Sequence, residues 1–413
     1  MSANPIQTNA ELQQTAENLR LKVQDFQNQL LNKFNKIEGA QGAYLKLIEQ
    51  RKRALMIINK NPALFIGAFI TLLSICVYFL FIYKRVDRFL ARTNIYEIQA
   101  NSIKDSEEVM NGNFKLCDFY VASSYKSFLP CTNYYDYSSI QSVEKMIRLG
   151  ARFIDLDIFN KSFDEHTEPV ICTGTEIGNW QYTTYITLED TCKMIAQTAF
   201  NSTLVHNASD PFFICLNFKT WYNKETISKC AEIIKNHFQH KLLSPDYGWQ
   251  GRNTSANIAL APIKELFNKL IIISTGDIQG TDMDELCNLH PEKNINLRAY
   301  TNRQVKDSYN PSELKEYNKR NLTLVTPDFN SRIKENYNFY TPYYLGCQFI
   351  CMNYTEPTEY MKAYAKRFQK CSFILKPLKL RYKPITIPKP LKQDKRVSFA
   401  PRSVVTPIAT IKF

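Results

Sequence analysis

The sequence predicts an α/β barrel that follows an N-terminal helix and one transmembrane helix. Three patterns in the chain of 413 residues lead to this prediction. Short apolar segments alternate with longer amphipathic segments over residues 113–383, which is typical of the strands and helices of a barrel. A run without any charge fills residues 63–83, and apolar side chains recur at helical spacing over residues 9–57.

Residues 1–62 are predicted to form an amphipathic or coiled-coil helix. Apolar side chains recur there at spacings of three and four: Leu19, Val23, Phe26, Leu30, Phe34 and Ile37. Such a stripe suits a coiled coil with a partner helix, and it equally suits a helix that lies on a membrane or on its own domain. Because the heptad is short and imperfect, both interpretations stay open.

Residues 63–83 are predicted to span a membrane once. The segment reads ALFIGAFITLLSICVYFLFIY, and 21 helical residues cross a hydrocarbon core of about 30 Å. It lies too far into the chain for a cleaved signal peptide, and aromatic side chains crowd its second end, as is typical of a membrane interface. Because Lys and Arg flank both ends, the charge pattern does not give the side on which the barrel lies.

Residues 84–112 are predicted to form a polar stalk, and residues 113–383 the barrel. The strand candidates are residues 119–122, 152–159, 169–172, 212–218, 270–274, 322–325 and 347–354. The helix candidates are residues 140–149, 187–200, 224–242 and 312–319.

The net charge of +13 lies mainly at the two ends of the chain. Residues 1–60 hold 9 Lys and Arg against 5 Asp and Glu, and residues 381–413 hold 8 against 1. Basic ends beside a membrane segment favour a membrane with anionic lipid head groups as the partner. The chain has neither zinc-finger spacing nor an RNA-binding aromatic motif, so we expect no nucleic acid partner. Residues 384–413, rich in proline and lysine, are predicted to be a disordered basic tail.

The segment RFIDLDIF, residues 152–159, carries the first chemical signal. Side chains alternate along a strand, so its aliphatic residues face the helices while Asp155 and Asp157 face the barrel mouth. Two carboxylates held close together in a low dielectric cannot both stay ionised without a cation. A metal such as calcium or magnesium would serve, and so would a lysine.

Six segments together resemble the phosphoinositide-specific phospholipase C family. FYVASSYKSFL, GARFIDLDIF, EPVICTG and DPFFICLNF are similar to motifs of its X region, in the family's order. GCQFICMNYTEP and CSFILKPLKLR are similar to the end of its Y region. The resemblance implies a TIM-like (β/α)8 barrel of the phospholipase C-like phosphodiesterases, with an X-like part at residues 113–220 and a Y-like part at residues 317–383.

The departures from the family fall on its chemistry. The resemblance places Tyr125 and Thr173 where the family has its two acid–base histidines. Tyr has an ordinary pKa near 10 and a Thr hydroxyl does not titrate usefully, so neither replaces an imidazole at neutral pH. We therefore expect a pseudoenzyme that acts as a scaffold or as a lipid-surface or phosphate-binding module. The alternative is a divergent active phosphoric diester hydrolase that uses Asp155, Asp157 and His166, which follows the aspartate strand.

The family's calcium ligands, an Asn and three carboxylates, correspond to Lys126, Asp155, Asp157 and Asn217 here. Lys219 lies on the same strand face as Asn217. Two Asp and two Lys sum to zero charge, so we expect Lys126 to stand in for calcium, paired with Asp155 or Asp157, and no cofactor. Calcium on Asp155 and Asp157 belongs to the active alternative. Lys126 and Lys219 either bind one phosphate or belong to an ion-pair network that only satisfies internal charge.

The tail contains a second partner signal. KRVSFAP, residues 395–401, matches the Arg-Val-x-Phe docking pattern for protein phosphatase 1 through Arg396, Val397 and Phe399. Val397 and Phe399 would lie on one face of an extended peptide that adds to a sheet edge. This adaptor function requires a cytosolic tail. Five glycosylation sequons point to the opposite compartment, at Asn201, Asn207, Asn253, Asn321 and Asn353, and the sequence does not resolve this conflict.

Overall fold

The computed structural model contains two compact units, Met1–Val86 and Asp87–Phe413. The structure describes residues 9–34, 47–53, 56, 60, 62–96, 98–131, 137–161, 168–175, 180–248, 256–293, 296–328, 335–384, 401 and 403–412. The sequons and candidate residues outside these ranges are Asn253, His166, Arg396, Val397 and Phe399.

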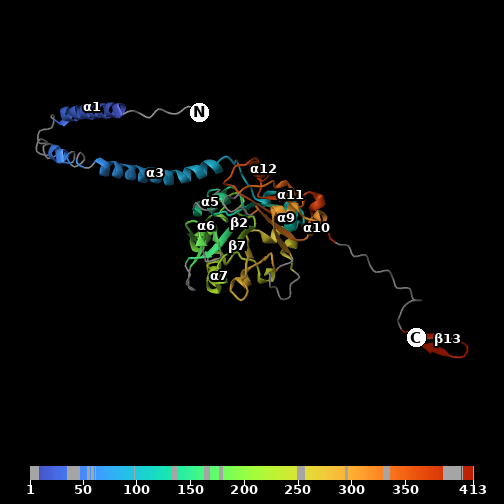
Figure 1. Ribbon diagram of the computed structural model, residues 1–413. Coiled ribbons are helices and arrows are strands. Elements are labelled where there is room, and N and C mark those ends of the chain that lie inside the picture. Colours follow the sequence, from blue (N-terminus) through green and yellow to red (C-terminus); the bar gives the residue numbers. More distant parts are fainter. Residues whose placement is uncertain are drawn as a thin grey trace. The chain divides into compact units, whose positions relative to one another are not determined.

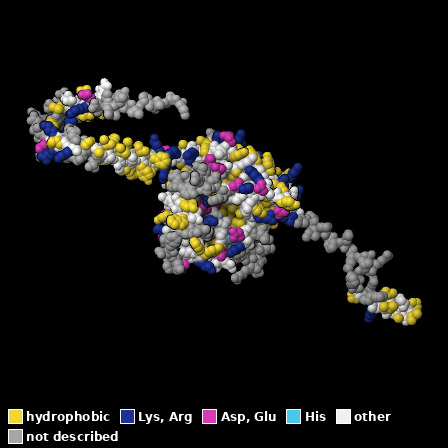
Figure 2. Space-filling model, viewed as in Figure 1, with side chains coloured by type: hydrophobic (Ala, Val, Ile, Leu, Met, Phe, Trp, Pro, Cys, Tyr) yellow, Lys and Arg dark blue, Asp and Glu magenta, His cyan; other side chains and the backbone are white. Residues whose placement is uncertain are grey.

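The first unit contains helix α1 (Asn9–Phe34) and most of helix α3 (Pro62–Thr93). Within α3, Ile66–Thr93 is by length and composition able to cross a membrane, with a mean hydropathy of 2.3. Figure 2 shows hydrophobic side chains gathered along this helix. The helix expected over residues 9–57 corresponds to α1 and to helical residues 47–53. The apolar side chains of α1 that the structure describes, such as Leu19 and Phe26, are exposed.

The second unit is built on a sheet of TIM-barrel type (Figure 1). Its parallel strands follow one another in the order β9, β10, β11, β1, β2, β7 and β8. Their bounds are β9 Leu297–Thr301, β10 Leu322–Thr326, β11 Phe349–Met352, β1 Phe119–Ser124, β2 Phe153–Asn160, β7 Phe212–Phe218 and β8 Leu270–Thr275. Within the described residues no ladder joins β8 to β9.

Three short strands extend this sheet in antiparallel pairing. β12 (Phe373–Leu375) pairs with β1, β3 (Pro169–Ile171) pairs with β2, and β6 (Ile186–Thr187) pairs with β3. Beyond β3, β4 (Gly174–Thr175) and β5 (Trp180–Gln181) form a separate hairpin. This hairpin follows directly from the strand whose end carries Thr173.

Helices α5 (Ile140–Arg148), α6 (Leu188–Thr198) and α7 (Lys224–Phe238) cover the outer face of β2 and β7 (Figure 1). Ile154, Leu156 and Ile158 pack with apolar side chains of these helices in one buried cluster. The alternate side chains of the same strands lie in a different cluster inside the barrel, with Phe153 and Phe213 among them. The period of two in β2 thus separates an apolar outer face from an inner face that includes both aspartates.

The remaining helices are short and close the loops between strands. They are α4 (Glu107–Asn111), α8 (Met283–Leu286), α9 (Asn302–Lys306), α10 (Pro311–Tyr317), α11 (Tyr340–Tyr344) and α12 (Glu359–Arg367). Among the described residues, five helices begin at a side chain that accepts a hydrogen bond from the backbone N–H three residues later: Thr187, Asn223, Thr301, Asn310 and Thr358. These caps satisfy backbone donors that would otherwise lack a partner within the helix.

The expected stalk of residues 84–112 is for the most part wrong. Phe89, Tyr96 and Ile103 are buried in the barrel unit. The carboxylate of Asp210 accepts hydrogen bonds from Ser102 Oγ at 2.6 Å and from the backbone N–H of Ile103 at 3.0 Å. The segment is polar on average, and a few well-spaced apolar side chains are enough to dock it on the barrel.

The expected disorder of the tail does not hold for its last residues. Strands β13 (Ser403–Val405) and β14 (Thr410–Lys412) pair as an antiparallel hairpin. The turn is closed by a hydrogen bond of 2.9 Å from the backbone N–H of Thr406 to the carbonyl of Ala409. β-branched residues on both sides of a tight turn favour such a hairpin.

Candidate functional site

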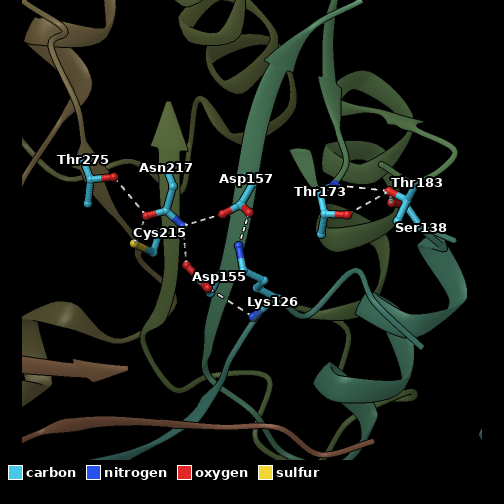
Figure 3. A network of polar contacts seen from close by, with 9 residues as sticks. All are labelled: Lys126, Ser138, Asp155, Asp157, Thr173, Thr183, Cys215, Asn217 and Thr275. Atoms are coloured by element: carbon cyan, nitrogen blue, oxygen red, sulfur yellow. Dashed lines mark hydrogen bonds and ion pairs between the residues drawn. The ribbon is translucent and has the colours of Figure 1, made fainter. Parts of the chain in front are cut away.

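The carboxyl ends of β1, β2, β7 and β8 bring the candidate site together (Figure 3). In the register of the sheet, Asp157 lies beside Asn217, and Asn217 lies beside Thr275. Lys126 follows the end of β1 in the loop that leads away from the strand. Side chains from four neighbouring strands or their loops therefore converge, as is typical of sites at the carboxyl end of a barrel.

Lys126 faces the carboxylates through two different atoms. Its ammonium forms an ion pair with Asp157, and both side chains are largely buried. Its backbone N–H donates a hydrogen bond of 3.1 Å to Asp155 Oδ2. The backbone of Lys126 has a φ of +40°, in the left-handed region that a residue with a side chain seldom adopts. The loop is thus turned so that the N–H and the ammonium both reach the aspartates.

Asn217 holds the two aspartates from the other side. Its Nδ2 donates to Asp155 Oδ1 at 2.6 Å and to Asp157 Oδ1 at 3.1 Å. Its Oδ1 accepts a hydrogen bond of 2.9 Å from Thr275 Oγ1. The amide therefore turns its donor, and not its oxygen, toward the carboxylates.

The pKa of Asp155 is raised to about 6. Burial is the largest cause, and the neighbouring charge of Asp157 adds to it. The charge and N–H of Lys126 and the amide of Asn217 act in the opposite direction, because they stabilise the ionised carboxylate. The Lys126 ammonium and the Asn217 amide thus oppose the tendency of burial to protonate Asp155.

Tyr125 and Thr173, which resemblance places at the family's histidine positions, have different contacts. Tyr125 packs against the interior cluster, and Lys126 Nζ lies 5.6 Å from the centre of its ring. The backbone N–H of Thr173 donates to Thr183 Oγ1 at 3.1 Å, and Thr183 Oγ1 lies 2.9 Å from Ser138 Oγ. Thr173 therefore belongs to a group of hydroxyls that Figure 3 shows beside the carboxylate cluster.

The structure brings together Lys126, Asp155, Asp157 and Asn217 among the predicted site residues. Lys219 follows β7, and its backbone N–H donates to the carbonyl of Ile158 at 2.8 Å. Within the described part of the chain, no ion pair joins the Lys219 ammonium to the cluster. His166 lies outside the described residues, as does the Arg-Val-x-Phe segment.

Sequence reasoning missed the hydroxyl partners of the site. Thr275 ends β8 beside Asn217, and Thr183 and Ser138 surround Thr173. Thr275 could have been found from its position: it ends a buried strand, β8, that neighbours β7. Thr183 and Ser138 come from loops, for which no local pattern indicated a contact.

The donor set does not fit a calcium ion. Calcium prefers six to eight oxygen ligands. Here an ammonium faces Asp157, and the nitrogen of the Asn217 amide faces both aspartates. Across the residues that the structure describes, no group of three His, Cys, Asp or Glu side chains comes together that would hold a metal.

Exposed aromatic side chains lie on the segments that follow β3 and β7. We call them the aromatic rim: Trp180, Tyr182, Tyr185, Trp221 and Tyr222. Trp180 is 69% exposed and Trp221 57% exposed. Asn160, at the end of β2, connects the two loops that carry these tryptophans. Its Nδ2 donates to the carbonyl of Thr220 at 2.9 Å, and its carbonyl accepts from Gln181 Nε2 at 2.8 Å.

Comparisons with known proteins support the fold of the second unit. The chain is 26% identical over 141 residues to 1-phosphatidylinositol 4,5-bisphosphate phosphodiesterase beta egl-8 of Caenorhabditis elegans, which covers 34% of this chain and 9% of that protein. The crystal structures of PLC21 from L. pealei and S. officinalis have TM-scores of 0.52 and 0.53 to this fold. Each is 18% identical, and each alignment covers 65% of this chain and 38% of the other. The chain thus spans well under half the length of these relatives.

The family match places the candidate site inside one domain. The model of the family described as phosphatidylinositol-specific phospholipase C, X domain, matches residues 113–275. It therefore extends past residue 220, where the X-like part was expected to end, and includes β8. The matched range contains every member of the cluster from Lys126 to Thr275. Residues 113–275 of this chain are thus similar to the X domain of phosphatidylinositol-specific phospholipase C, on a fold similar to that of the PLC21 structures.

Proposed function

We propose that the chain is a membrane-anchored and catalytically inactive phospholipase C-like protein that binds lipid surfaces. The observation that carries this proposal is the ion pair between Lys126 and Asp157. A cation that belongs to the chain compensates the buried carboxylates without a metal. The position that resemblance assigns to an oxygen ligand of calcium is then filled by a positive charge.

The hydroxyls at the two histidine positions support inactivity. General acid–base catalysis at neutral pH needs a group whose pKa lies near neutrality. The ordinary pKa of a tyrosine is near 10, and the hydroxyl of Thr173 lies among the hydroxyls of Thr183 and Ser138. Neither Tyr125 nor Thr173 provides a group that exchanges a proton with substrate at neutral pH.

The aromatic rim supports binding to a lipid surface. Trp and Tyr side chains are favoured at membrane interfaces, because one end is apolar and the other forms hydrogen bonds with water. Trp221 and Tyr222 both have a positive φ, of 48° and 60°, so the loop after β7 presents two neighbouring aromatics in strained backbone. Such strain persists only where the surrounding structure imposes it. The rim stands at the same end of the strands as the cluster.

Helix α3 supports anchoring in a membrane. Its apolar stretch is long enough for one crossing, and its side chains are exposed over residues 66–81. With anchoring by a helix, the barrel needs only weak lipid contacts of its own, because the tether keeps its local concentration at the membrane high. Lys219, partly exposed beside the cluster, is then the cation that would meet the phosphate of a head group.

Calcium distinguishes this proposal from an active enzyme. The purified full chain should hydrolyse no phosphatidylinositol in millimolar calcium, and calcium should leave its thermal denaturation midpoint unchanged. In Lys126→Asn the positive charge is removed and an amide oxygen is introduced, so calcium should raise the midpoint of this variant. Calcium-dependent hydrolysis by the unmodified chain that Asp155→Ala abolishes would overturn the proposal.

Lipid binding is tested separately, with the rim. The full chain and a double variant of the rim are reconstituted in anionic vesicles and treated with protease. We expect Trp221→Ala/Tyr222→Ala to make the barrel loops more accessible to protease in anionic vesicles, while membrane association through α3 is retained. Tyr344→Ala, which changes an exposed aromatic before β11, is the matched control. Equal protection in all three proteins would contradict a role of the rim.

A further inference from the structure

A basic pocket lies at the other end of the barrel strands. Residues 113–118 lead into β1, and residues 376–384 follow β12. Because β12 runs antiparallel to β1, with Leu375 opposite Phe119, both segments meet at the amino end of β1. The carboxylate cluster lies at the carboxyl end of the same strand. Between the two segments is a hollow of about 830 Å³, which we call the amino-end pocket.

The amino-end pocket combines apolar walls with a positively charged rim. Its lining includes Phe114, Lys115, Leu378, Lys379, Arg381 and Lys383. Lys379 and Lys383 are exposed, and Lys115 and Arg381 are half-buried. Among the described residues no ion pair is formed by Lys115, Lys379 or Lys383. An anion in the hollow would therefore meet cations that are not already neutralised.

Asp118 is the one acidic residue in the lining, and its carboxylate accepts hydrogen bonds from the backbone. Asp118 Oδ2 accepts a hydrogen bond of 2.8 Å from the N–H of Lys115. Its Oδ1 accepts one of 2.6 Å from the N–H of Tyr382. Asp118 thereby joins the two segments that form the pocket. Its charge offsets one of the four cations in the lining, so the pocket keeps a positive balance.

Arg381 is held in position for a ligand. Its Nε donates to the carbonyl of Lys376, and its guanidinium lies 5.4 Å from the centre of the Phe114 ring. The nearest acidic group is Glu108, whose Oε1 is 3.8 Å from Nη1. Because Nε is anchored and the guanidinium lies against the Phe114 ring, the position of the outer nitrogens is restricted, with Nη1 facing Glu108. Planar, oriented donors of this kind suit the oxygens of a phosphate.

We propose that the amino-end pocket binds an organic phosphate. The phosphate contacts Arg381 and the lysines of the rim, and the organic part packs on Phe114 and Leu378. A pocket with apolar walls and a few placed polar groups is typical of small-molecule sites. Soluble nucleotides and phospholipid head groups share this chemistry, and the two sources are separated by experiment. The proposal does not depend on the state of the carboxylate cluster.

The test uses the full chain in neutral phosphatidylcholine nanodiscs. Three probes are titrated and followed calorimetrically: pyrophosphate, ADP and a water-soluble short-chain phosphatidic acid. We expect saturable binding of ADP or of phosphatidic acid, tighter than that of pyrophosphate and weakened by salt. Binding of ADP assigns a soluble source, and binding of phosphatidic acid assigns a lipid source. Failure of both organic probes to saturate overturns the proposal, as does binding of pyrophosphate with equal affinity.

Charge variants identify the pocket as the place of binding. Arg381→Gln and Lys379→Gln should each weaken binding roughly tenfold, because each removes a charge-assisted contact. Lys366→Gln, which removes an exposed charge on α12, is the matched control and should bind like the unmodified chain. Because Arg381 also donates to the carbonyl of Lys376, its substitution changes the fold as well as the charge. Lys379→Gln, whose thermal denaturation midpoint should stay unchanged, tests binding independently of folding. Equal affinity in Lys379→Gln and in the control would overturn the assignment.

Discussion

Lys126 joins the backbone geometry of a loop to the charge of a site. The left-handed backbone of a residue with a side chain costs on the order of 1 kcal/mol. The same conformation allows its N–H to reach Asp155 while its ammonium reaches Asp157. These contacts to buried carboxylates offset the cost, because an unpaired charge at this depth would be far more unfavourable.

Asp210 provides a prediction at the residue scale. Burial raises its pKa to about 6, and the charge of Arg152 only partly opposes this. The ionised form is thus disfavoured in the folded chain, so Asp210 adds stability below pH 4 that is lost as the pH rises through 6. Asp210→Asn should therefore be more stable than the unmodified chain at pH 7, by roughly 2 kcal/mol, and the difference should vanish near pH 4. Urea denaturation at the two pH values measures it.

Two features make this prediction specific. Oδ1 of Asp210 accepts from Ser102 and from Ile103, and an amide oxygen would accept in the same way. Arg152 keeps its bonds to the carbonyls of Ala199 and Asn207 in the variant. A stability difference that does not change with pH would show that burial does not govern this carboxylate.

The site residues on strands were easier to predict than their partners. The period of two in RFIDLDIF predicts that Asp155 and Asp157 share a face, and the structure places both in one cluster. The orientation of the Asn217 amide depends on Thr275, which reaches it through the register between β7 and β8. No local pattern carries that register. Lys126 was expected beside the aspartates from resemblance and from charge counting, whereas its positive φ has no signal in the sequence.

Gly150 tests the docking of the former stalk at the scale of elements. It precedes β2 with a φ of +83°, and an added Cβ would lie 2.7 Å from the Cβ of Ala100. Gly150→Ala should therefore strain the turn and displace the segment around Ala100, at a cost of about 1–3 kcal/mol. Chemical denaturation measures the loss. Hydrogen exchange should also become faster at the amides of Gln99 and Asn101, which bond to carbonyls near the start of β12.

Gly67→Ala is the matched control for this substitution. Gly67 lies in α3, where an added Cβ would meet nothing within 4 Å. We expect denaturation of the barrel and exchange at Gln99 to stay unchanged in this variant. If Gly150→Ala behaved in the same way, the close approach at Gly150 would have no energetic consequence.

At the scale of elements, buried strands were predicted well and partly exposed ones were not. β7 matches its predicted range because its segment, FFICLNF, is apolar except for Asn217 and lies between Asp210-Pro211 and Lys219. β9 was missed because its segment, LRAYT, is polar and mostly half-exposed, and within the described residues it pairs with β10 alone. Helix α12 was also missed. The stalk was misjudged because its average polarity hides the few side chains that dock it.

The sequons provide a prediction at the scale of the whole molecule. Asn207 Nδ2, the atom that would carry a glycan, is buried and donates to Ser372 Oγ at 2.6 Å. Asn353 is also buried, and its Oδ1 accepts from Thr355. A folded chain cannot carry a glycan at either site. Glycosidase treatment of the expressed protein should therefore give the same mobility shift with and without Asn353→Gln.

Asn201 serves as the comparison, because its side chain lies in a partly exposed turn. If the barrel lies on the glycosylated side of a membrane, Asn201→Gln should reduce the mobility shift. A shift that Asn353→Gln alone reduces would contradict the packing of β11 and the residues that follow it.

The ion pair of Lys126 has a consequence for signalling. A free metal ion reaches a site only as often as its concentration allows, whereas a tethered ammonium has a very high effective concentration beside its partner. Under the proposed function, the carboxylates of this barrel would be compensated independently of any rise or fall of calcium in the surrounding compartment. A lipid-binding module built in this way would be constitutive, and its occupancy would follow the composition of the membrane rather than a calcium pulse.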